Sequence, residues 1–263
     1  MNRSERLSAL LELLAEAGQL EVDEIVERLE VSPATARRDL DALAREQLLT
    51  RTRGGARAFS VAYDLPLRYK NLQRPDAKTA IARAASGLVS PGAIIGLSGG
   101  TTTTGIATEL LARPDLMEPG DDPGLTVVTN AVNIAMELAA RPRIKTVVTG
   151  GVVHARSYEL VGAHADAVLR GFTLDLAFIG VNAIDPALGP TVHDEREAAV
   201  NAAIAARAER AVVVADSSKI GRRAFATVGG PSLFGMLVTD SGITDEQRAQ
   251  FETAGLEVVV ADV

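Results

Sequence analysis

The sequence contains no cysteine and no tryptophan, and aromatic residues make up only 3% of its 263 residues. Without thiols there can be no disulfide, no zinc–thiolate or iron–sulfur site and no thiol nucleophile, which is typical of proteins from a reducing compartment. The scarcity of aromatic side chains argues against a stacking platform for single-stranded nucleic acid. These absences exclude several classes of protein before any motif is considered.

Long apolar runs are also missing. No run reaches the ~18 residues that a membrane span needs. The N-terminal stretch MNRSERLSALLELLAEAG lacks the apolar core of a signal peptide. We therefore expect a cytoplasmic protein with no membrane partner. The formal charge of −7 argues weakly against a protein coated in nucleic acid, although net charge can hide a local basic face.

What is present at the N-terminus is a series of short helical patterns. Apolar residues recur at helical spacing over residues 7–14 and again over 22–29, and Gly18 between them is a helix stop signal. Ser32 is a favoured N-cap, and Pro33 is favoured as the first residue of a third helix.

After that helix, residues 48–53 are expected to form a short strand, and a turn follows at Gly54-Gly55. Three short helices followed by a hairpin are typical of a winged helix-turn-helix domain, which we place at residues 1–58.

Six arginines stand on the third helix and the wing, against three acidic residues. Because Ala36, Leu40 and Leu43 would face inward, the opposite face of this helix could enter a DNA major groove while the wing contacts phosphates. The residues expected to bind DNA are Ser32, Thr35, Arg37, Arg38, Arg51 and Arg53. In the alternative interpretation the arginines form surface salt bridges, since Asp41 lies at helical spacing from Arg38 and Arg45. The complete pattern favours DNA.

Residues 59–76 show no periodicity and are expected to be a linker. Beyond it, apolar β-rich runs alternate with helical segments, which favours a mostly parallel α/β sheet covered on both faces, in a second domain at residues 77–263. Strands are expected at 93–97, 125–129, 144–149, 174–179, 211–215, 236–239 and 257–261. Helices are expected at 78–88, 102–112, 131–140, 158–170, 194–208 and 245–254.

The run LSGGTTTTG, residues 97–105, joins the first of these strands to a helix. A glycine-rich strand-to-helix turn leaves backbone N–H groups at the positive end of the helix, and threonine hydroxyls add donors, so the run resembles a phosphate cradle. It lacks the lysine of a nucleotide-binding P-loop and does not fit G-x-G-x-x-G, which favours a small phosphorylated molecule over ATP or NAD. Taken alone, a capped helix start with packed threonines explains the run equally well.

Small or polar residues also follow other expected strands, and ligands bind at the carboxyl ends of strands in open parallel sheets. Asp194 and Glu197 could accept hydrogen bonds from sugar hydroxyls, although singly each is better explained as a helix cap. Lys219 could pair with a phosphate. The expected effector-binding residues are Gly99, Gly100, Thr101, Thr102, Thr103, Asn130, Gly150, Gly151, Asp194, Glu197 and Lys219.

The three histidines, at 154, 164 and 193, do not have a metal-ligand spacing, and no G-x-S-x-G elbow is present. His154 and His193 follow or flank strand-end loops and could reach the site, but a surface or packing role is the better explanation of each histidine. No metal, cofactor or catalytic residue is expected.

The sequence resembles the DeoR-type transcriptional regulators over nearly its whole length. VSPATARRDLDALAREQLLTRTRGGA resembles the helix-turn-helix signature of that family, with Ala36 in place of the usual Ile and Arg53 where His is common. In the second half the resemblance rests on residues 78–82, 100–103, 129–130, 150–151, 197–198 and 216–219. Ser98 stands where many members have Asp, and Asn201 where many have Lys.

The resemblance implies a DNA-binding regulator, most simply a repressor of a carbohydrate operon. Its partners would be double-stranded operator DNA, a phosphorylated sugar and further copies of itself in a dimer or tetramer. Its sensor domain would be similar in fold to ribose-5-phosphate isomerase, glucosamine-6-phosphate deaminase and CoA-transferase subunits. Two alternatives remain: a phosphosugar isomerase or deaminase with a DNA-binding head, and an architectural DNA protein with a vestigial enzyme domain.

Overall fold

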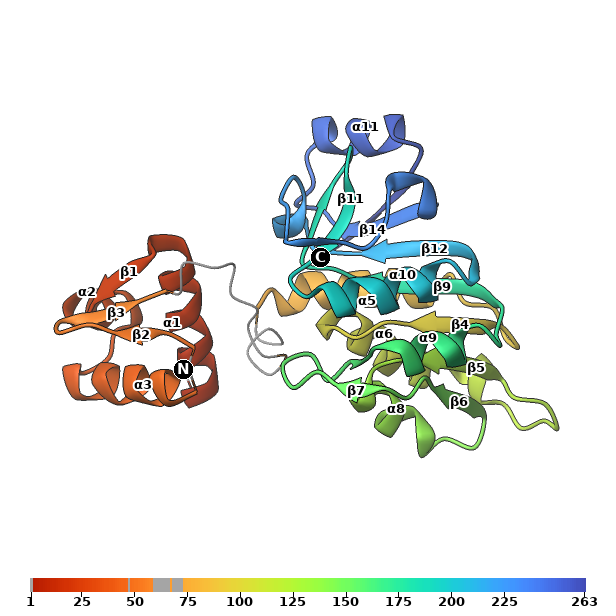
Figure 1. The fold of residues 1–263 in the computed structure, drawn as a ribbon, viewed down its shortest axis with the longest axis horizontal. Coiled ribbons are helices and arrows are strands. Elements are labelled where there is room, and N and C mark those ends of the chain that lie inside the picture. Colours follow the sequence, from red (N-terminus) through yellow and green to blue (C-terminus); the bar gives the residue numbers. More distant parts are fainter. Residues whose placement is uncertain (1, 47, 59–66, 68–72) are drawn as a thin grey trace. The chain divides into compact units, whose positions relative to one another are not determined.

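The computed structural model describes the chain except for residues 1, 47, 59–66 and 68–72. It divides into two compact units, Met1–Gln73 and Arg74–Val263, coloured from red to orange and from orange to blue in Figure 1. Most of the expected linker, 59–76, lies outside the described residues, and Pro75 already begins a helix. Each unit has its own hydrophobic core, so each is described by itself.

The first unit is a winged helix-turn-helix domain. Its described elements are α1 (Arg3–Ala17), β1 (Gln19–Glu21), α2 (Val22–Leu29), α3 (Pro33–Arg45), β2 (Thr50–Arg51) and β3 (Gly55–Arg57). The expected hairpin is part of a larger antiparallel sheet with the order β1-β3-β2, because β1 pairs with β3. The short β1 carries no period-2 pattern long enough to reveal it in the sequence.

Helix ends in this unit follow the local chemistry of the sequence. Gly18 ends α1 with φ 74°, a backbone conformation that glycine adopts readily. Ser32 caps α3, with its hydroxyl accepting a hydrogen bond from the Thr35 N–H, and Pro33 occupies the first helical position. Both ends were expected, and Leu10, on α1, is fully buried in the core.

The second unit is built on a parallel sheet of seven strands. Their spatial order is β15-β14-β12-β9-β4-β5-β6. The strands are β4 (Ile94–Leu97), β5 (Leu125–Thr129), β6 (Ile144–Val148), β9 (Leu174–Gly180), β12 (Ala208–Val214), β14 (Met236–Asp240) and β15 (Glu257–Ala261). Each strand expected from the sequence is present, with small differences at its ends.

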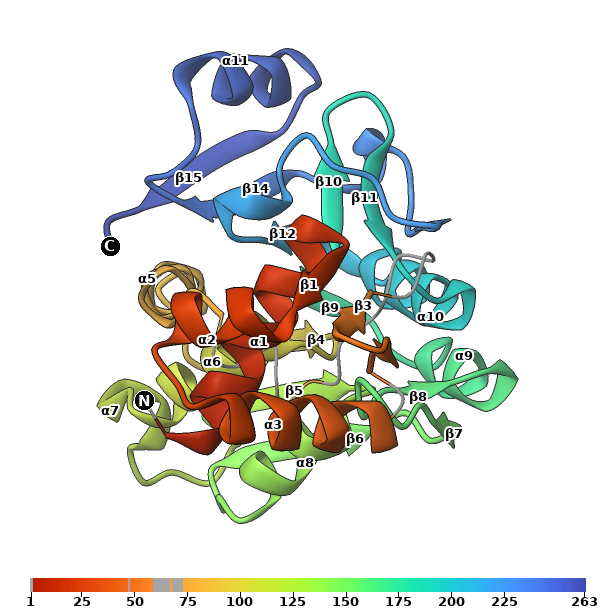
Figure 2. The same cartoon turned by 90° about the vertical axis from the view of Figure 1, so that its left-hand side faces the viewer.

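Helices and short strands complete this unit (Figures 1 and 2). The described helices are α5 (Pro75–Ser86), α6 (Thr101–Leu111), α7 (Pro114–Met117), α8 (Val132–Ala139), α9 (Ala163–Leu169), α10 (Glu195–Ala205) and α11 (Asp245–Thr253). Two small antiparallel sheets consist of β7 (Val152–Val153) with β8 (Leu160–Val161), and of β10 (Ala183–Asp185), β11 (Gly189–Val192) and β13 (Ala226–Thr227).

The large sheet separates two hydrophobic cores. Along β12, Val212 and Val214 belong to the core shared with α5, α6 and α8, whereas Val213 belongs to the core shared with α9, α10 and α11. This alternation follows from the period of two in a strand. Both faces are therefore covered, as the run of apolar residues in each strand predicts.

The connecting helices change faces at the middle of the sheet. Helices α6 and α8 follow β4 and β5 on one face, while α10 and α11 follow β9 and β14 on the other. Strands β4 and β9 are neighbours, so their loops diverge to opposite faces at their carboxyl ends. Such a topological switch point is where open α/β sheets bind ligands.

The prediction of a helix over residues 158–170 is partly wrong. Leu160 and Val161 form β8 and pair with β7, and only Ala163–Leu169 is helical. Gly162, with φ 98°, separates the strand from the helix. None of the helices in the described part of the chain combines the length and apolarity needed to cross a bilayer.

Candidate functional site

Helix α3 exposes the arginines assigned to DNA. Ala36, Leu40 and Leu43 are fully buried in the core of the first unit, whereas Arg37 and Arg38 lie on the exposed face. The helix is therefore amphipathic in the sense the sequence predicted, with its basic face turned to solvent.

The start of α3 is shaped by Ser32 and Thr35. The Ser32 hydroxyl accepts a hydrogen bond from the Thr35 N–H at 3.1 Å and lies 2.9 Å from the Thr35 hydroxyl. Ser32 therefore serves as a cap here, and the remaining first-turn N–H groups are those that a helix leaves without intrahelical partners. A phosphate at this end would meet them.

The wing arginines have different environments. Arg51 forms an ion pair with Asp41 of α3, with 3.0 Å between Nε and Oδ1, and also donates to the Gly55 carbonyl. Arg53 is exposed in the turn between β2 and β3. Arg51 thus ties the wing to α3, while Arg53 projects from the wing.

The salt-bridge alternative fits only part of this face. Arg38 and Arg45 each direct Nε to a backbone carbonyl, of Ala34 and Asp41 respectively, at 3.3 Å. Among the described residues, Asp41 pairs with the Arg51 side chain rather than with either of these. The helical arginines keep charged nitrogens for an outside partner.

A groove of about 330 Å³ lies between α1 and α3. Its lining residues are Arg3, Arg6, Thr35, Arg38, Asp39, Asp41 and Arg45. Arg6 binds the buried Asp39 through contacts of 2.5 Å and 3.2 Å and so fixes α1 to α3. Arg3 was not identified from the sequence, because nothing in the spacing places the start of α1 beside α3.

In the second unit, the LSGGTTTTG loop leads from β4 into α6 as expected. Gly100 caps α6 with φ 133°, and the Thr104 N–H donates to the Gly100 carbonyl at 3.0 Å. The N–H groups before Thr104 stand at the positive end of an eleven-residue helix. At the neighbouring strand end, Gly180 donates its N–H to the Ser98 hydroxyl at 2.9 Å.

The threonines of this loop do not share one role. The Thr103 hydroxyl donates to the Gly100 carbonyl at 3.0 Å, so it stabilises the turn. The Thr102 hydroxyl is buried, with the residue 2% exposed, and has no hydrogen-bond partner among the described residues. Thr101 is half-buried. Buried polar groups rarely stay unpaired, so Thr102 is the threonine whose hydroxyl a ligand would complete.

Asn130 and Glu159 lie beside the loop. Asn130 donates from Nδ2 to Glu159 Oε2 at 2.9 Å, and its own Oδ1 is buried without a partner among the described residues. A Cβ placed on Gly99 would lie 2.2 Å from Glu159 Cγ and 2.7 Å from Oε1. Glu159 therefore rests directly on the glycine of the cradle. It was not identified from the sequence, because it lies just before the short strand β8 and reaches the loop only through the fold.

Asp194 and Glu197 meet at the start of α10 together with His154 and Ser157. Glu197 Oε1 lies 2.8 Å from His154 Nδ1 and accepts from the Ser157 hydroxyl at 2.5 Å. His154 Nε2 is 3.7 Å from Asp194. The expected surface or packing role of His154 therefore omits its contact with both candidate carboxylates.

Asp194 is also the cap of α10. A hydrogen bond from the Arg196 side chain, opposed by partial burial and helped by the Arg196 and Glu197 N–H groups, lowers the pKa of Asp194 to about 2. Asp194 is thus an ionised carboxylate at neutral pH, and the cap interpretation is correct for it. A role toward a ligand would come in addition.

Lys219 lies at the carboxyl end of β12. Its Nζ donates to the Val181 carbonyl at 2.8 Å and lies 3.9 Å from Asp216. Burial alone would raise the pKa of Asp216, but Lys219 and the Ser218 hydroxyl hold it below its ordinary value. Since Val181 follows Gly180, Lys219 is placed next to the switch point.

Arg74, the first residue of this unit, binds acidic residues at the carboxyl ends of β12 and β14. It lies 3.3 Å from Asp216 and 3.4 Å from Asp240, both buried, and donates to the Ser217 hydroxyl at 2.9 Å. Arg74 has φ 48°, in the left-handed region. Sequence reasoning missed it because an arginine at the end of a linker carries no local signal.

Gly150 and Gly151 form the turn between β6 and β7. Both have positive φ, and a Cβ on Gly151 would lie 2.7 Å from the Val161 carbonyl oxygen. Both are exposed, and no contact in the described part of the chain joins them to the α6 loop. Their geometry explains why glycine is needed here without a ligand.

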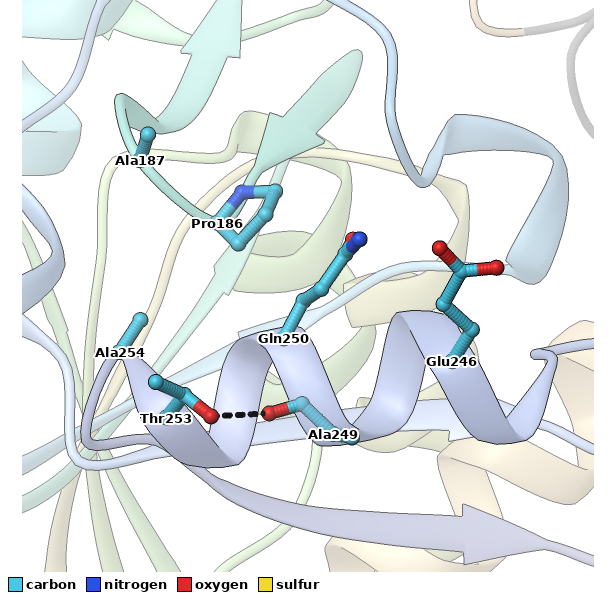
Figure 3. A pocket seen from close by; sticks show the side chains of 7 residues that line it. All are labelled: Pro186, Ala187, Glu246, Ala249, Gln250, Thr253 and Ala254. Carbon is cyan, nitrogen blue, oxygen red and sulfur yellow. Dashed lines mark hydrogen bonds between the residues drawn. The ribbon is translucent and has the colours of Figure 1, made fainter.

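A second hollow, of about 510 Å³, lies away from these residues (Figure 3). It is bounded by the tip of the β10–β11 hairpin and by α11, with Pro186 and Ala187 facing Ala249, Gln250 and Ala254 across it in a mostly apolar lining. It contains none of the residues expected to bind an effector.

The chain matches known domains over both units. The DeoR-like helix-turn-helix domain matches residues 6–61, and the DeoR C terminal sensor domain matches residues 73–241. The first range lies within the first compact unit, and the second begins one residue before the second unit.

Similar proteins cover nearly the whole chain. The HTH-type transcriptional regulator GlpR of Haloferax volcanii is 31% identical over 97% of each chain. The glycerol-3-phosphate regulon repressor of Escherichia coli K12 is 28% identical over 92% of each. Ribose 5-phosphate isomerase A of Methanocaldococcus jannaschii aligns with 56% of this chain and 55% of its own, with 19% identity and a TM-score of 0.39. Because the sensor-domain match spans more than half of the chain, this protein belongs to the DeoR family of helix-turn-helix transcriptional regulators.

Proposed function

We propose that this protein is a cytoplasmic repressor of a carbohydrate operon whose binding to operator DNA is controlled by a phosphorylated sugar. The proposal of such an effector rests on one observation. The open N-terminus of α6 lies at the switch point of the sheet, where the buried Thr102 hydroxyl has no partner among the described residues. A dianionic phosphate would accept from both the helix N–H groups and this hydroxyl. The name of the E. coli relative, a glycerol-3-phosphate regulon repressor, supports this class of ligand.

In the DNA-bound state, α3 would lie in the major groove. Arg37 and Arg38 would reach base edges, and Ser32, Thr35, Arg51 and Arg53 would contact the backbone. A two-fold operator requires at least a dimer, so we propose a homo-oligomer. The domains would be 1–58 for DNA and 77–263 for the effector, with the linker 59–76 between them.

In the effector-bound state, residues 99–103 would hold the phosphate, and Asn130, Asp194, Glu197 and Lys219 would bind hydroxyl or phosphate oxygens. Gly150 and Gly151 would shape the neighbouring turn. The effector controls DNA binding only if it binds the DNA-competent and DNA-incompetent arrangements with different affinities.

The DNA half is tested by fluorescence anisotropy with duplex DNA taken from the region flanking the protein's own coding sequence. Replacing Arg37 or Arg38 by Ala should cost about 1–3 kcal/mol of binding and relax sequence preference. The control Arg141→Ala removes an exposed arginine from the second unit. Equal losses in all three variants would contradict a specific role for α3.

The effector half is tested by repeating the titration with a panel of sugar phosphates and the matching unphosphorylated sugars. At least one phosphorylated compound should change the affinity for DNA by about 5–150-fold, the usual range of allosteric coupling. If none does, the sensing role is wrong.

A second candidate function rests on the His154–Glu197 pair. An imidazole 2.8 Å from a carboxylate could move a proton on a bound sugar phosphate. Turnover of ribose 5-phosphate or glucosamine 6-phosphate by the purified protein, abolished in His154→Ala, would support an isomerase or deaminase; its absence in both proteins would leave regulation alone.

A further inference from the structure

The carboxylate of Glu159 lies against the proposed anion cradle. The side chain packs on Gly99 so closely that a Cβ there would meet three of its atoms, at 2.2–2.7 Å. Glu159 is 4% exposed, and its Oε2 is fixed by the Asn130 amide at 2.9 Å. A carboxyl group is thus already placed beside the positive end of α6.

The backbone of Glu159 is held firmly. Its carbonyl accepts from the His154 N–H at 2.7 Å, and its backbone bridges to Ala131. Only the side chain can therefore leave the cradle, by rotating about its own bonds. The absence of a side chain at Gly99 gives it the space that it occupies.

We propose that Glu159 is an internal competitor that determines which anions the cradle accepts, an inference that rests on the proposed effector site. A phosphate entering the loop must displace this side chain, and the cost of moving it lowers the affinity of every anion by a common factor. A monoanion then has too little interaction energy left to bind, whereas a dianionic phosphate ester keeps enough. The ratio of the two affinities is unchanged, but at a given concentration only the dianion still occupies the site.

The test measures binding of inorganic phosphate at pH 8, by isothermal titration calorimetry, to the full-length wild-type protein and to Glu159→Gln. The substitution keeps the shape of the side chain and removes its charge. We expect about tenfold tighter phosphate binding, the size of effect expected from one nearby charge at a partly buried site. Formate, which the wild type should not bind measurably, should become detectable.

Glu137→Gln is the matched control. Glu137 is on α8 and accepts from the hydroxyl of Thr108, on α6, at 2.9 Å. The substitution therefore makes the same chemical change beside α6, but away from the cradle. It should leave phosphate affinity unchanged. Glu159→Asp, which keeps the charge but withdraws it by one methylene group, should give an intermediate affinity and covers the case in which Glu159→Gln fails to fold.

The outcomes separate the two proposals. If the wild type binds phosphate and Glu159→Gln binds it equally or more weakly, the competitor role is overturned and the effector site stands. If Glu159→Gln leaves phosphate unchanged but weakens ribose 5-phosphate, Glu159 binds sugar hydroxyls, and the competitor role is also overturned. If no variant binds phosphate, the effector site itself is wrong and this inference falls with it.

Discussion

Asn201 is buried in α10, and neither polar atom of its amide has a hydrogen-bond partner among the described residues. A buried polar group without a partner costs about 1–3 kcal/mol. A bound ligand or a water molecule that pairs with the amide would offset this cost.

We therefore predict that Asn201→Leu, which has a similar shape, stabilises the protein by about 1–2 kcal/mol. Equilibrium denaturation in urea would measure the change. Asn201→Asp, which places a charge at the same buried position, should instead destabilise it. A destabilised Leu variant would mean that the amide is satisfied in solution, for example by water.

Asp194 gives a prediction for pH. Because its pKa is lowered to about 2, chiefly by Arg196, its ionised form stabilises the folded state above the ordinary pKa of ~3.9. This contribution is lost as the pH falls from that value toward 2. Arg196 is half exposed, so solvent screening reduces the contribution to about 1 kcal/mol.

Asp194→Asn keeps an oxygen for the helix N–H groups and removes the charge. Its free energy of unfolding should be about 1 kcal/mol below that of the wild type at pH 7. The gap should stay constant down to about pH 5 and narrow below pH 4. A gap that does not change between pH 7 and 3 would rule out an ionic origin.

At the scale of elements, Arg74 fixes the start of α5 to the ends of β12 and β14. Its guanidinium is shared by Asp216 and Asp240, both buried, while Arg74 itself is partly exposed. Arg74→Ala should lower the free energy of unfolding of the second unit by about 2 kcal/mol, because Asp240 then loses its cation.

The left-handed backbone of Arg74 provides a control. Arg74→Gly loses the same ion pairs but relieves about 1 kcal/mol of backbone strain, so it should be less destabilised than the Ala variant. Denaturation followed by circular dichroism would compare the two. If Gly and Ala are equally destabilised, the left-handed conformation is not maintained in solution.

Many of the helix ends and strands could be predicted from the sequence. Helix caps such as Ser32 and Gly18 depend on neighbouring residues, and strands that are buried on both faces consist of runs of apolar residues. Both features can therefore be recognised in the sequence. The short strands β1, β7 and β8 could not be predicted, because two or three residues carry no periodicity and owe their pairing to distant partners.

The same difference between local and tertiary signals applies to the candidate site. The cradle at residues 99–103 could be predicted because glycines and a helix start are adjacent in the chain. Glu159 and Arg74 could not, since each reaches the site only through tertiary contacts. Gly150 and Gly151 were expected at the site for their position after a strand, and no described contact joins them to the cradle.

At the scale of the whole molecule, the two units have separate cores and should unfold in separate transitions. A sugar phosphate at 100 times its dissociation constant should stabilise the second unit by about 2.7 kcal/mol. Differential scanning calorimetry should then show two transitions, with only one shifted to higher temperature. Operator DNA should shift the other. A single transition moved by both ligands would show that the units unfold together.

The parallel pairing of β4 and β9 at the middle of the sheet has one more consequence. A small molecule bound at the ends of these strands, where Gly180 donates to Ser98, would hold together two segments that lie 82 positions apart in the sequence. Binding of this molecule should therefore slow amide hydrogen exchange at the centre of the sheet, in β4 and β9. Exchange in the outermost strands β6 and β15 should not change.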